Sequence, residues 1–243
     1  MRFKGEYIKI KKLKKNLTKI AIYSVNYLRS KMNHFEDELY KCFESRSNIV
    51  KLLNYRNYKF TDPKGDIEFD EFKNIYNDNE IVDVKKSMSD DLTIINNENE
   101  SENCFIQWIS DTKLNADKIN ELVLQISDVN TKTIIIISDY KPTPNAIDAV
   151  KLLKIVDNIK IDIWDFNQTQ IFAPEHEYVP KHRICTNLEK TKLFNVYGDD
   201  IPKINLNDIM VKYLAAVKGN LIEIIRPSET VKNKSDCTYR IVV

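Results

Sequence analysis

The chain has 243 residues, of which 42% are hydrophobic and 30% are charged, a balance typical of a soluble globular protein with one large domain or two small ones. No stretch approaches the roughly 20 uncharged apolar residues that a membrane-spanning helix needs, and the lysine-rich first 19 residues lack the apolar core of a secretory signal. The formal net charge of +1 by itself argues against a protein dedicated to nucleic-acid binding.

The near-zero net charge hides three zones of different sign. Residues 1–19 are strongly basic, residues 62–102 are acidic, and the remainder is mixed. A lysine-rich amphipathic helix at the N-terminus is able to bind nucleic acid, an acidic partner or a membrane surface, and a solvated face is the alternative interpretation. The four cysteines lie far apart without a C-x-x-C pair, which is typical of inert thiols in a reducing compartment such as the cytosol or nucleus.

The first 57 residues carry apolar side chains at helical spacing, which predicts two or three helices. Phe69, Phe72 and Tyr76 predict another short helix. Strands are predicted by short β-branched or aromatic runs at residues 92–95, 104–109, 133–138 and 160–164.

Helical patterns separate the last three of these predicted strands. This alternation implies crossover connections and a mostly parallel sheet. The Ile134–Ile137 run is apolar on both faces, so we expect it to be the central strand. Residues 96–103 are expected to form a polar hairpin loop or an insertion.

A second unit is predicted to start near Pro174. Thr186 and Glu189 have the spacing of a capping box, so a helix should begin there. Asp208 can cap a further helix through Leu214, with Gly219 ending it in a left-handed conformation. Residues 221–225 and 238–243 then predict two strands, joined by a linker that begins at Arg226-Pro227. The result is an α+β module of about 70 residues, near the lower limit for independent folding.

Motifs of common enzyme classes are absent from the sequence. It has no glycine-rich phosphate loop, no nucleophile elbow, no H-E-x-x-H motif and no zinc-spaced cysteine set. His176, His182 and Cys185 lie close enough in sequence to suggest a metal site, but no fourth ligand follows at regular spacing and Pro180 makes the segment an extended connector. We therefore predict no catalytic residue, no metal and no cofactor.

A metal-dependent nuclease is the enzymatic alternative. Asp111-Thr112-Lys113 and Asp139-Tyr140-Lys141 each follow a predicted strand in a D-x-K arrangement, in which the carboxylate can hold Mg²⁺ and the lysine can stabilise phosphate charge. The second carboxylate that such a site needs is ambiguous between Asp90 and Asp91. Solvated charges at strand ends are the other interpretation.

The segment Lys141-Pro142-Thr143-Pro144-Asn145 joins the predicted central strand to a helix. Its side chains and the first amides of the helix can therefore point at an anion from the carboxyl edge of the sheet. An ordinary strand-to-helix turn with an N-cap fits the same residues equally well.

The C-terminal module also carries an ordered set of motifs. They are E-H-E-Y-V-P-K-H at residues 175–182, I-P-K-I at 201–204, a run from Asp208 to Leu214, Lys218-Gly219, I-I-R-P-S-E-T at 224–230 and T-Y-R-I-V-V at 238–243. In this order they resemble the fifth common subunit of eukaryotic RNA polymerases, whose C-terminal half is similar to a small subunit of archaeal RNA polymerase.

The resemblance extends into the N-terminal half. The Phe105–Trp108 and Ile134–Ile137 strands and the Thr143–Ala146 turn are similar to the eukaryotic jaw domain, which in that family is a restriction-endonuclease-like α/β fold without nuclease activity. The resemblance thus implies a basic helical extension at residues 1–45 with no family counterpart, an α/β jaw with a mostly parallel sheet at 46–172, and a small α+β assembly domain, similar to the archaeal protein, at 173–243.

The family role implies a non-catalytic subunit of a multi-subunit DNA-dependent RNA polymerase, with a Mg-dependent nuclease or a stand-alone transcription adaptor as alternatives. The assembly domain would anchor to the largest subunit, beside other small polymerase subunits, and the jaw would contact downstream duplex DNA without sequence specificity. No membrane and no small-molecule substrate are expected as partners.

The residues carried over by the resemblance form two sets. The DNA-proximal set is Lys141, Thr143, Pro144 and Asn145. The subunit-interface set is Glu175, His176, Pro180, His182, Pro202, Tyr213, Gly219, Arg226, Pro227, Ser228, Glu229, Thr230, Tyr239 and Arg240.

Several residues depart from the family pattern. Lys212 stands in place of the arginine of D-P-V-A-R-Y, which removes the bidentate fork and predicts weaker pairing with any carboxylate. Ala215 replaces a glycine, and a longer polar loop at residues 231–236 replaces A-G-R-Y. These departures suggest a diverged polymerase. The composition and the extension at residues 1–45 favour a large DNA virus, hence the virion and host cytoplasm, while a cellular source would imply the nucleus.

Overall fold

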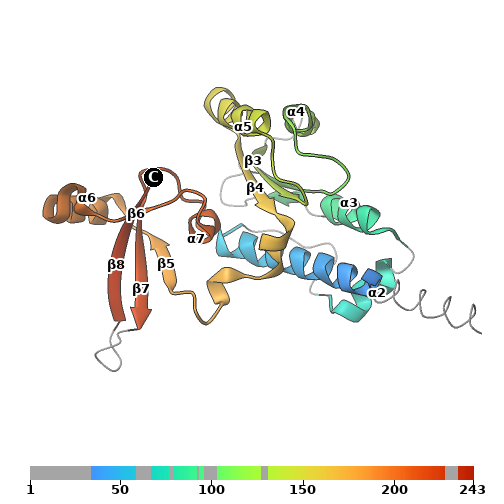
Figure 1. The fold of residues 1–243 in the computed structure, drawn as a ribbon, viewed down its shortest axis with the longest axis horizontal. Helices are drawn as coiled ribbons and strands as arrows, with labels where there is room; N and C mark the ends of the chain where they lie inside the picture. The colour runs from blue at the N-terminus through green and yellow to red at the C-terminus, as the bar shows by residue number, and fades with distance from the viewer. Residues whose placement is uncertain are drawn as a thin grey trace, which may run out of the picture.

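Two four-stranded sheets organise the chain (Figure 1). The computed structural model describes residues 34–58, 67–76, 79–91, 93–95, 103–126, 131–227 and 235–243. We call residues 34–172 the N-terminal unit and residues 173–243 the C-terminal unit. Among the described residues, no helix is long and apolar enough to cross a membrane. The expected basic extension, through residue 33, lies outside the described residues, and so does the loop expected at 96–103 except for Asn103, which is in a strand.

The first sheet has the strand order β1-β2-β3-β4. Its members are β1 (Thr93–Ile95), β2 (Asn103–Ile109), β3 (Thr131–Ser138) and β4 (Lys160–Asp165). Strands β2, β3 and β4 are parallel, and β1 pairs antiparallel with β2. The predicted parallel order is confirmed, and the isoleucine run lies in an inner strand, because β3 pairs with a neighbour on each side.

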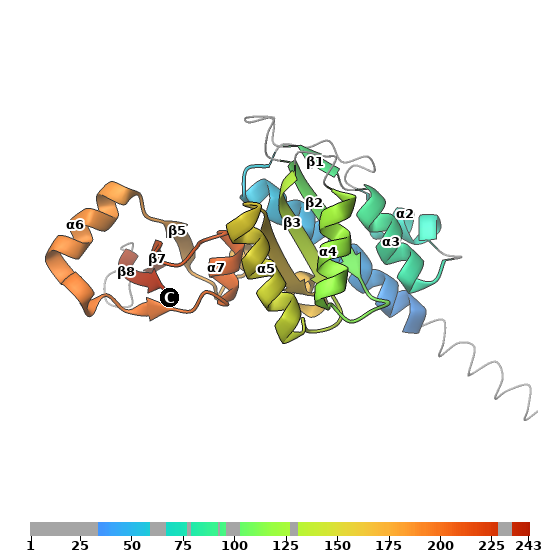
Figure 2. The same cartoon turned by 90° about the horizontal axis from the view of Figure 1, so that it is seen from above.

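Helices cover both faces of this sheet (Figure 2). Ile134 and Ile136 of β3 pack against α4 (Ala116–Gln125) and α5 (Pro144–Val156). Ile135 and Ile137 point to the opposite face. There they meet a helix over residues 34–55, α2 (Phe69–Tyr76) and α3 (Ile81–Asp91). Burial on both faces explains why β3 reads as a continuous apolar run rather than an alternating one.

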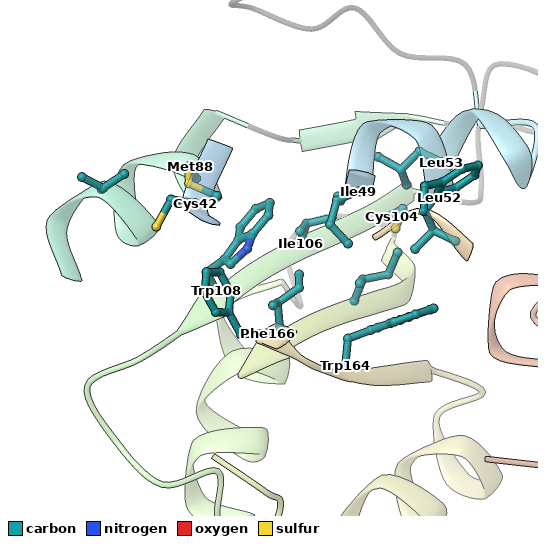
Figure 3. Close-up of a cluster of buried hydrophobic side chains, with 14 of the residues drawn as sticks. Cys42, Ile49, Leu52, Leu53, Met88, Cys104, Ile106, Trp108, Trp164 and Phe166 are labelled. Carbon is teal, nitrogen blue, oxygen red and sulfur yellow. The ribbon is translucent and has the colours of Figure 1, made fainter. Parts of the chain in front are cut away.

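One continuous helix spans residues 34–55. The remainder of the segment for which two or three helices are expected, residues 1–33, lies outside the described residues. The helix also crosses the expected boundary between residues 45 and 46, and Leu39 and Cys42 are fully buried in the same core as Trp108. Figure 3 shows side chains of this helix, Ile49 among them, pointing toward β2. Residues 34–45 therefore belong to the N-terminal unit.

Three of the four cysteines are buried, and all four are free thiols. Burial raises the pKa of Cys42 and of Cys104 to about 12, which keeps these thiols protonated at neutral pH. The nucleophilic thiolate is thereby disfavoured. Cys237 is exposed.

The second sheet has the order β5-β7-β8-β6. Its members are β5 (Lys181–Ile184), β6 (Lys203–Ile204), β7 (Leu221–Pro227) and β8 (Ser235–Val242). Only β6 and β8 pair in parallel. Arg226 and Pro227 extend β7 instead of starting the linker, because they pair with Asp236 and Ser235.

Two helices of the C-terminal unit begin where their caps predict. Thr186 and Glu189 form the reciprocal capping box at the start of α6 (Asn187–Tyr197). The Asp208 carboxylate accepts a hydrogen bond of 2.9 Å from the Met210 N–H at the start of α7 (Ile209–Tyr213). The expected stop at Gly219 is wrong. The helix ends at Tyr213 with Leu214 as its C-cap, and Ala215 takes the left-handed conformation with φ 51°.

Replacing Ala215 with glycine should therefore stabilise the folded protein. The Ala215 backbone occupies a region that costs a residue with a Cβ atom about 1–2 kcal/mol, partly offset by the greater chain entropy of glycine in the unfolded state. We expect Ala215→Gly to raise the free energy of unfolding by about 0.5–1 kcal/mol in urea denaturation.

Ala216 is the matched control, since it is buried and does not have a positive φ. Ala216→Gly should destabilise the protein by about 1 kcal/mol. Equal effects of the two substitutions would contradict the strain at Ala215.

Candidate nucleic-acid and subunit interfaces

The turn at residues 139–145 leaves the carboxyl end of β3 and enters α5. Its far end is tied to the neighbouring loop by the Thr143 N–H, which donates to the Leu114 carbonyl at 3.0 Å. The Thr143 hydroxyl accepts from the Ala146 N–H at 3.3 Å as the helix N-cap. Lys141 and Asn145 are exposed, and their side chains make no hydrogen bond or ion pair with any residue the structure describes.

These contacts divide the expected DNA-proximal set by role. Pro144, also exposed, occupies the first turn of α5, where its missing N–H costs nothing. Thr143 is half-buried and already engaged as the cap. Within this expected set, Lys141 and Asn145 are therefore the side chains that can reach an external phosphate.

The carboxylate required for a nuclease is engaged elsewhere. Both oxygens of Asp139 accept hydrogen bonds from Lys85 of α3, at 2.8 and 2.7 Å. Asp111 is exposed and accepts from its neighbour Thr112 at 3.4 Å. Among the described residues, no three His, Cys, Asp or Glu side chains group as metal ligands. The D-x-K segments do not assemble a Mg²⁺ site there.

The histidines near the start of the C-terminal unit have local partners. The Nδ1 atom of His182 lies 2.7 Å from the Pro180 carbonyl, and the Nδ1 atom of His176 accepts from the Tyr178 N–H at 3.3 Å. Cys185 is buried, and burial raises the pKa of its thiol. The three side chains do not form a shared site.

The expected subunit-interface residues differ in exposure. Exposed members are Glu175, His176, Pro202, Arg226 and Arg240, and half-buried members are Pro180, His182, Gly219 and Tyr239. Pro227 lies in β7. Ser228, Glu229 and Thr230 lie outside the described residues.

Gly219 takes φ 87° and its N–H donates to the Val242 carbonyl at 2.9 Å. It therefore shapes the entry into β7 rather than the end of α7.

Tyr213 departs from the expected set, because it is only 2% exposed. Its ring contacts Trp164 and Phe172 of the N-terminal unit, with centroids 5.0 and 5.3 Å away. Its hydroxyl donates to the Ile171 carbonyl at 3.0 Å. Tyr213 therefore joins the two units of this chain, and its side chain is already engaged within the chain.

A buried carboxylate organises the second sheet, and sequence reasoning missed it. Glu223 of β7 accepts from the Tyr239 hydroxyl at 2.9 Å and from Arg183 of β5. Arg183 also bonds both carboxylate oxygens of Glu189 on α6. The charge at Glu223, in the middle of an apolar run, was the available signal, because buried carboxylates need partners.

The shifted pKa values reflect this network. The hydrogen bond to the Glu223 carboxylate raises the pKa of Tyr239 to about 12. Hydrogen bonds from Arg183, and then from Thr186, lower the pKa of Glu189 to about 2. The expected interface residue Tyr239 is thus fixed in orientation by its own sheet.

Lys212 also joins the two units. Its ammonium donates to Gln168 Oε1 at 2.9 Å and lies 4.2 Å from the Trp164 ring centroid. The hydrogen bond of the Lys212 ammonium is thus made to an amide oxygen and not to a carboxylate. Burial lowers the pKa of Lys212 to about 8, with the charge of Arg56 acting in the same direction and Asp162 opposing it.

The lowered pKa of Lys212 predicts a pH dependence of stability. The unfolded chain keeps the ordinary lysine pKa of about 10.4, so folding disfavours the charged ammonium at low pH, and this cost is relieved as pH rises from about 8 toward about 10.4. The unfolding free energy of the wild type, measured in urea, should therefore increase over this range relative to Lys212→Met. A difference that does not change with pH would contradict the lowered pKa.

Comparison with known proteins agrees with the motif pattern. The family model described as RNA polymerase Rpb5, C-terminal domain, matches residues 172–242, and the model of the Rpb5 N-terminal domain matches residues 36–126. The second match begins inside the helix over residues 34–55, so part of the expected extension has a family counterpart.

Curated relatives match over most of their length. The chain is 27% identical over 213 residues to "DNA-directed RNA polymerases I, II, and III subunit RPABC1" of Caenorhabditis briggsae, covering 86% of this chain and 98% of the relative. It is 26% identical over 212 residues to the Dictyostelium discoideum subunit rpabc1, covering 85% and 100%. It is 20% identical to "DNA-directed RNA polymerase V subunit 5A" of Arabidopsis thaliana, covering 77% and 82%.

The motifs of the C-terminal unit, the two domain models in their family order and the near full-length relatives all agree. The chain belongs to the Rpb5 family of RNA polymerase subunits.

Proposed function

We propose that this chain is a non-catalytic subunit of a multi-subunit DNA-dependent RNA polymerase. The observation that carries this function is the match of both Rpb5 domain models, one on each unit of the chain. The relatives are named as polymerase subunits and align over nearly their whole length. Neither a nuclease nor a stand-alone adaptor has comparable support.

The C-terminal unit is proposed to anchor the chain to the largest polymerase subunit, beside other small subunits. The exposed side chains of the expected interface set, such as Arg226 and Arg240, are available for this contact. The N-terminal unit is proposed to be the jaw, with a restriction-endonuclease-like fold that lines the downstream DNA cleft. Its three parallel strands between helical layers support that fold class. We place the boundary between the two near residue 172, where the C-terminal family match begins.

The 139–145 turn is proposed to approach the backbone of downstream duplex DNA. Lys141 and Asn145 offer a charge and an amide without reading base edges, which suits a contact that must accept any template. The relatives are cellular proteins, so we propose a nuclear location. The comparisons contain nothing that supports the expected viral source or virion location.

Affinity purification from the source organism tests the subunit role. The full chain should recover the two large polymerase subunits in stoichiometric amounts. Elution of the chain without them would overturn the proposal. A variant with Arg226→Ala and Arg240→Ala in the C-terminal unit should lower recovery, while Lys141→Ala in the turn should not.

For the turn, we expect Lys141→Ala with Asn145→Ala to weaken retention of downstream DNA by the assembled polymerase. Only the loss of the Lys141 charge should affect the salt dependence, because an amide releases no counterion, so the magnitude of the logarithmic salt slope should fall by about one. Lys151→Ala is the control, because Lys151 is also exposed but lies within α5 in an ion pair with Asp148. An unchanged salt slope in the double variant would contradict contact by the turn.

A further inference from the structure

A partly buried ion pair lies at the start of the 139–145 turn, where the Asp139 side chain is 30% exposed. The side chain of Lys85 on α3 is only 5% exposed. Its ammonium bonds both carboxylate oxygens of Asp139, at 2.8 and 2.7 Å, and lies 3.7 Å from the ring centroid of Phe166. A cation taken out of water needs such partners, so its position is tightly constrained.

The backbone that carries Lys85 is fixed against the sheet. The Ser89 hydroxyl donates to the Lys85 carbonyl at 3.0 Å and accepts from the Trp108 N–H of β2 at 2.9 Å. One side chain thus connects α3 with the strand beside it. The Lys85 ammonium therefore projects from a helix that is itself hydrogen-bonded to the core.

Asp139 is the residue at which the chain leaves β3 for the turn. Its N–H donates to the Ile109 carbonyl at 3.2 Å, and the far end of the turn is tied by Thr143 to Leu114 at 3.0 Å. Of the acidic and basic side chains in the turn, Asp139 is held by the core and Lys141 is exposed. The Ser138 hydroxyl also holds this segment, because it accepts a hydrogen bond from the Tyr140 N–H at 3.1 Å. The ion pair is the tether that joins the start of the turn, two residues before Lys141, to α3.

We propose that Lys85 is a positioning residue for the DNA contact of the turn, acting through Asp139 rather than by touching DNA itself. This inference rests on the proposed function, because it assumes that the turn meets a phosphate backbone. It also gives the D-x-K segment a role: the aspartate orients the turn and the lysine that follows makes the contact.

The test uses the assembled polymerase carrying variants of the full chain. Lys85→Met removes the charge and keeps much of the side-chain volume, while Lys85→Arg keeps a cation that can bond both carboxylate oxygens. Ser45→Ala is the control for general destabilisation of the N-terminal unit. It removes the buried hydrogen bonds that the Ser45 hydroxyl accepts from Trp108 Nε1 at 2.9 Å and from Thr169 Oγ1 at 2.8 Å, and Ser45 makes no hydrogen bond with the turn itself.

Two readouts distinguish positioning from simple stability. Lys85→Met should speed amide hydrogen exchange within the turn and reduce the salt slope of retention of a labelled linear duplex by about one, as Lys141→Ala with Asn145→Ala does. Lys85→Arg should keep both the amide exchange rate in the turn and the salt slope of retention at their wild-type values. Ser45→Ala should change neither, although it lowers the midpoint of unfolding.

The outcomes separate the two proposals. Positioning is wrong if Lys85→Met leaves amide hydrogen exchange in the turn unchanged. It is also wrong if Lys85→Met leaves retention of DNA unchanged while Lys141→Ala with Asn145→Ala weakens it. In that second case the DNA contact stands. If none of these variants alters retention, the DNA contact itself fails and positioning fails with it.

Weaker DNA retention in Lys85→Met could also arise from charge alone. Without Lys85, the unpaired Asp139 carboxylate would repel phosphate even from a correctly placed turn. A variant with both Lys85→Met and Asp139→Asn carries no such charge but still lacks the tether. Retention should stay weak in this double variant, and complete recovery would overturn positioning.

Discussion

Replacing Arg56 with methionine is expected to lower the free energy of unfolding by about 3–5 kcal/mol, the cost of breaking a buried ion pair by removing one partner. The Arg56 side chain is 6% exposed, and its Nη1 atom lies 2.8 Å from Asp162 Oδ2 on β4. The same guanidinium donates to the backbone carbonyls of Lys212 at 2.7 Å and Tyr213 at 3.2 Å. The Arg56 side chain, just after the helix over residues 34–55, thus joins that helix to the first sheet and to α7.

Chemical denaturation measures this effect, with Lys51→Met as the matched control. Lys51 lies on the same helix and pairs with Glu175 across the two units, but both side chains are exposed and the atoms are 3.3 Å apart. Exposed pairs contribute about 0–1 kcal/mol, so the control should change little. Comparable losses in the two variants would contradict the special role of Arg56.

Tyr213→Ala is the second large effect, with an expected loss of about 3–5 kcal/mol, as for truncation of other buried aromatic side chains. The ring fills space between Trp164 and Phe172 and also meets Tyr55, with centroids 6.5 Å apart. Its removal leaves a cavity at the junction of the two units. Unfolding followed by tryptophan fluorescence should show the loss, because Trp164 lies against this ring.

Two further substitutions divide the contribution of Tyr213. Tyr213→Phe keeps the ring and loses the hydrogen bond to the Ile171 carbonyl, so about 1 kcal/mol should be lost. Tyr178→Ala is the surface control, because Tyr178 is 82% exposed, and its effect should stay within about 0.5 kcal/mol. If Tyr213→Ala were no more harmful than Tyr178→Ala, the packed junction would be wrong.

Together, Arg56 and Tyr213 connect the proposed jaw to the proposed assembly domain within one chain. The C-terminal unit is small, and its helix α7 places Met210 and Tyr213 in the core cluster of the N-terminal unit. Part of the support that such a small module needs therefore comes from its own chain. In the proposed polymerase, this junction would determine how the DNA-facing turn is held relative to the anchor.

Local patterns predicted much of the fold. The parallel order of β2, β3 and β4 followed from strand–helix alternation, and the starts of α6 and α7 followed from Thr186 and Asp208. These features depend on residues a few positions apart, so periodicity and capping chemistry are sufficient to find them. The stop of α7 was misplaced, because glycine is the usual signal for a left-handed residue and here Ala215 takes that conformation.

Contacts between distant residues were not visible in these patterns. Arg56 and Tyr213 are separated by more than 150 positions, and Lys85 and Asp139 by 54. In the sequence Asp139 appeared as a metal ligand or a solvated charge, and Tyr213 as a residue for another subunit. Only the folded chain shows that each has a partner in the same molecule.

The sequence alone determined the parallel arrangement of β2, β3 and β4, the starts of α6 and α7 and the family, because these depend on local spacing and on ordered motifs. The tertiary structure decided which charges are paired within the chain and which are not, as Asp139 and Lys141 illustrate. Burial and pairing are properties of three-dimensional neighbours: a lysine on α3 neutralises one charge at the turn and leaves the other available for a phosphate.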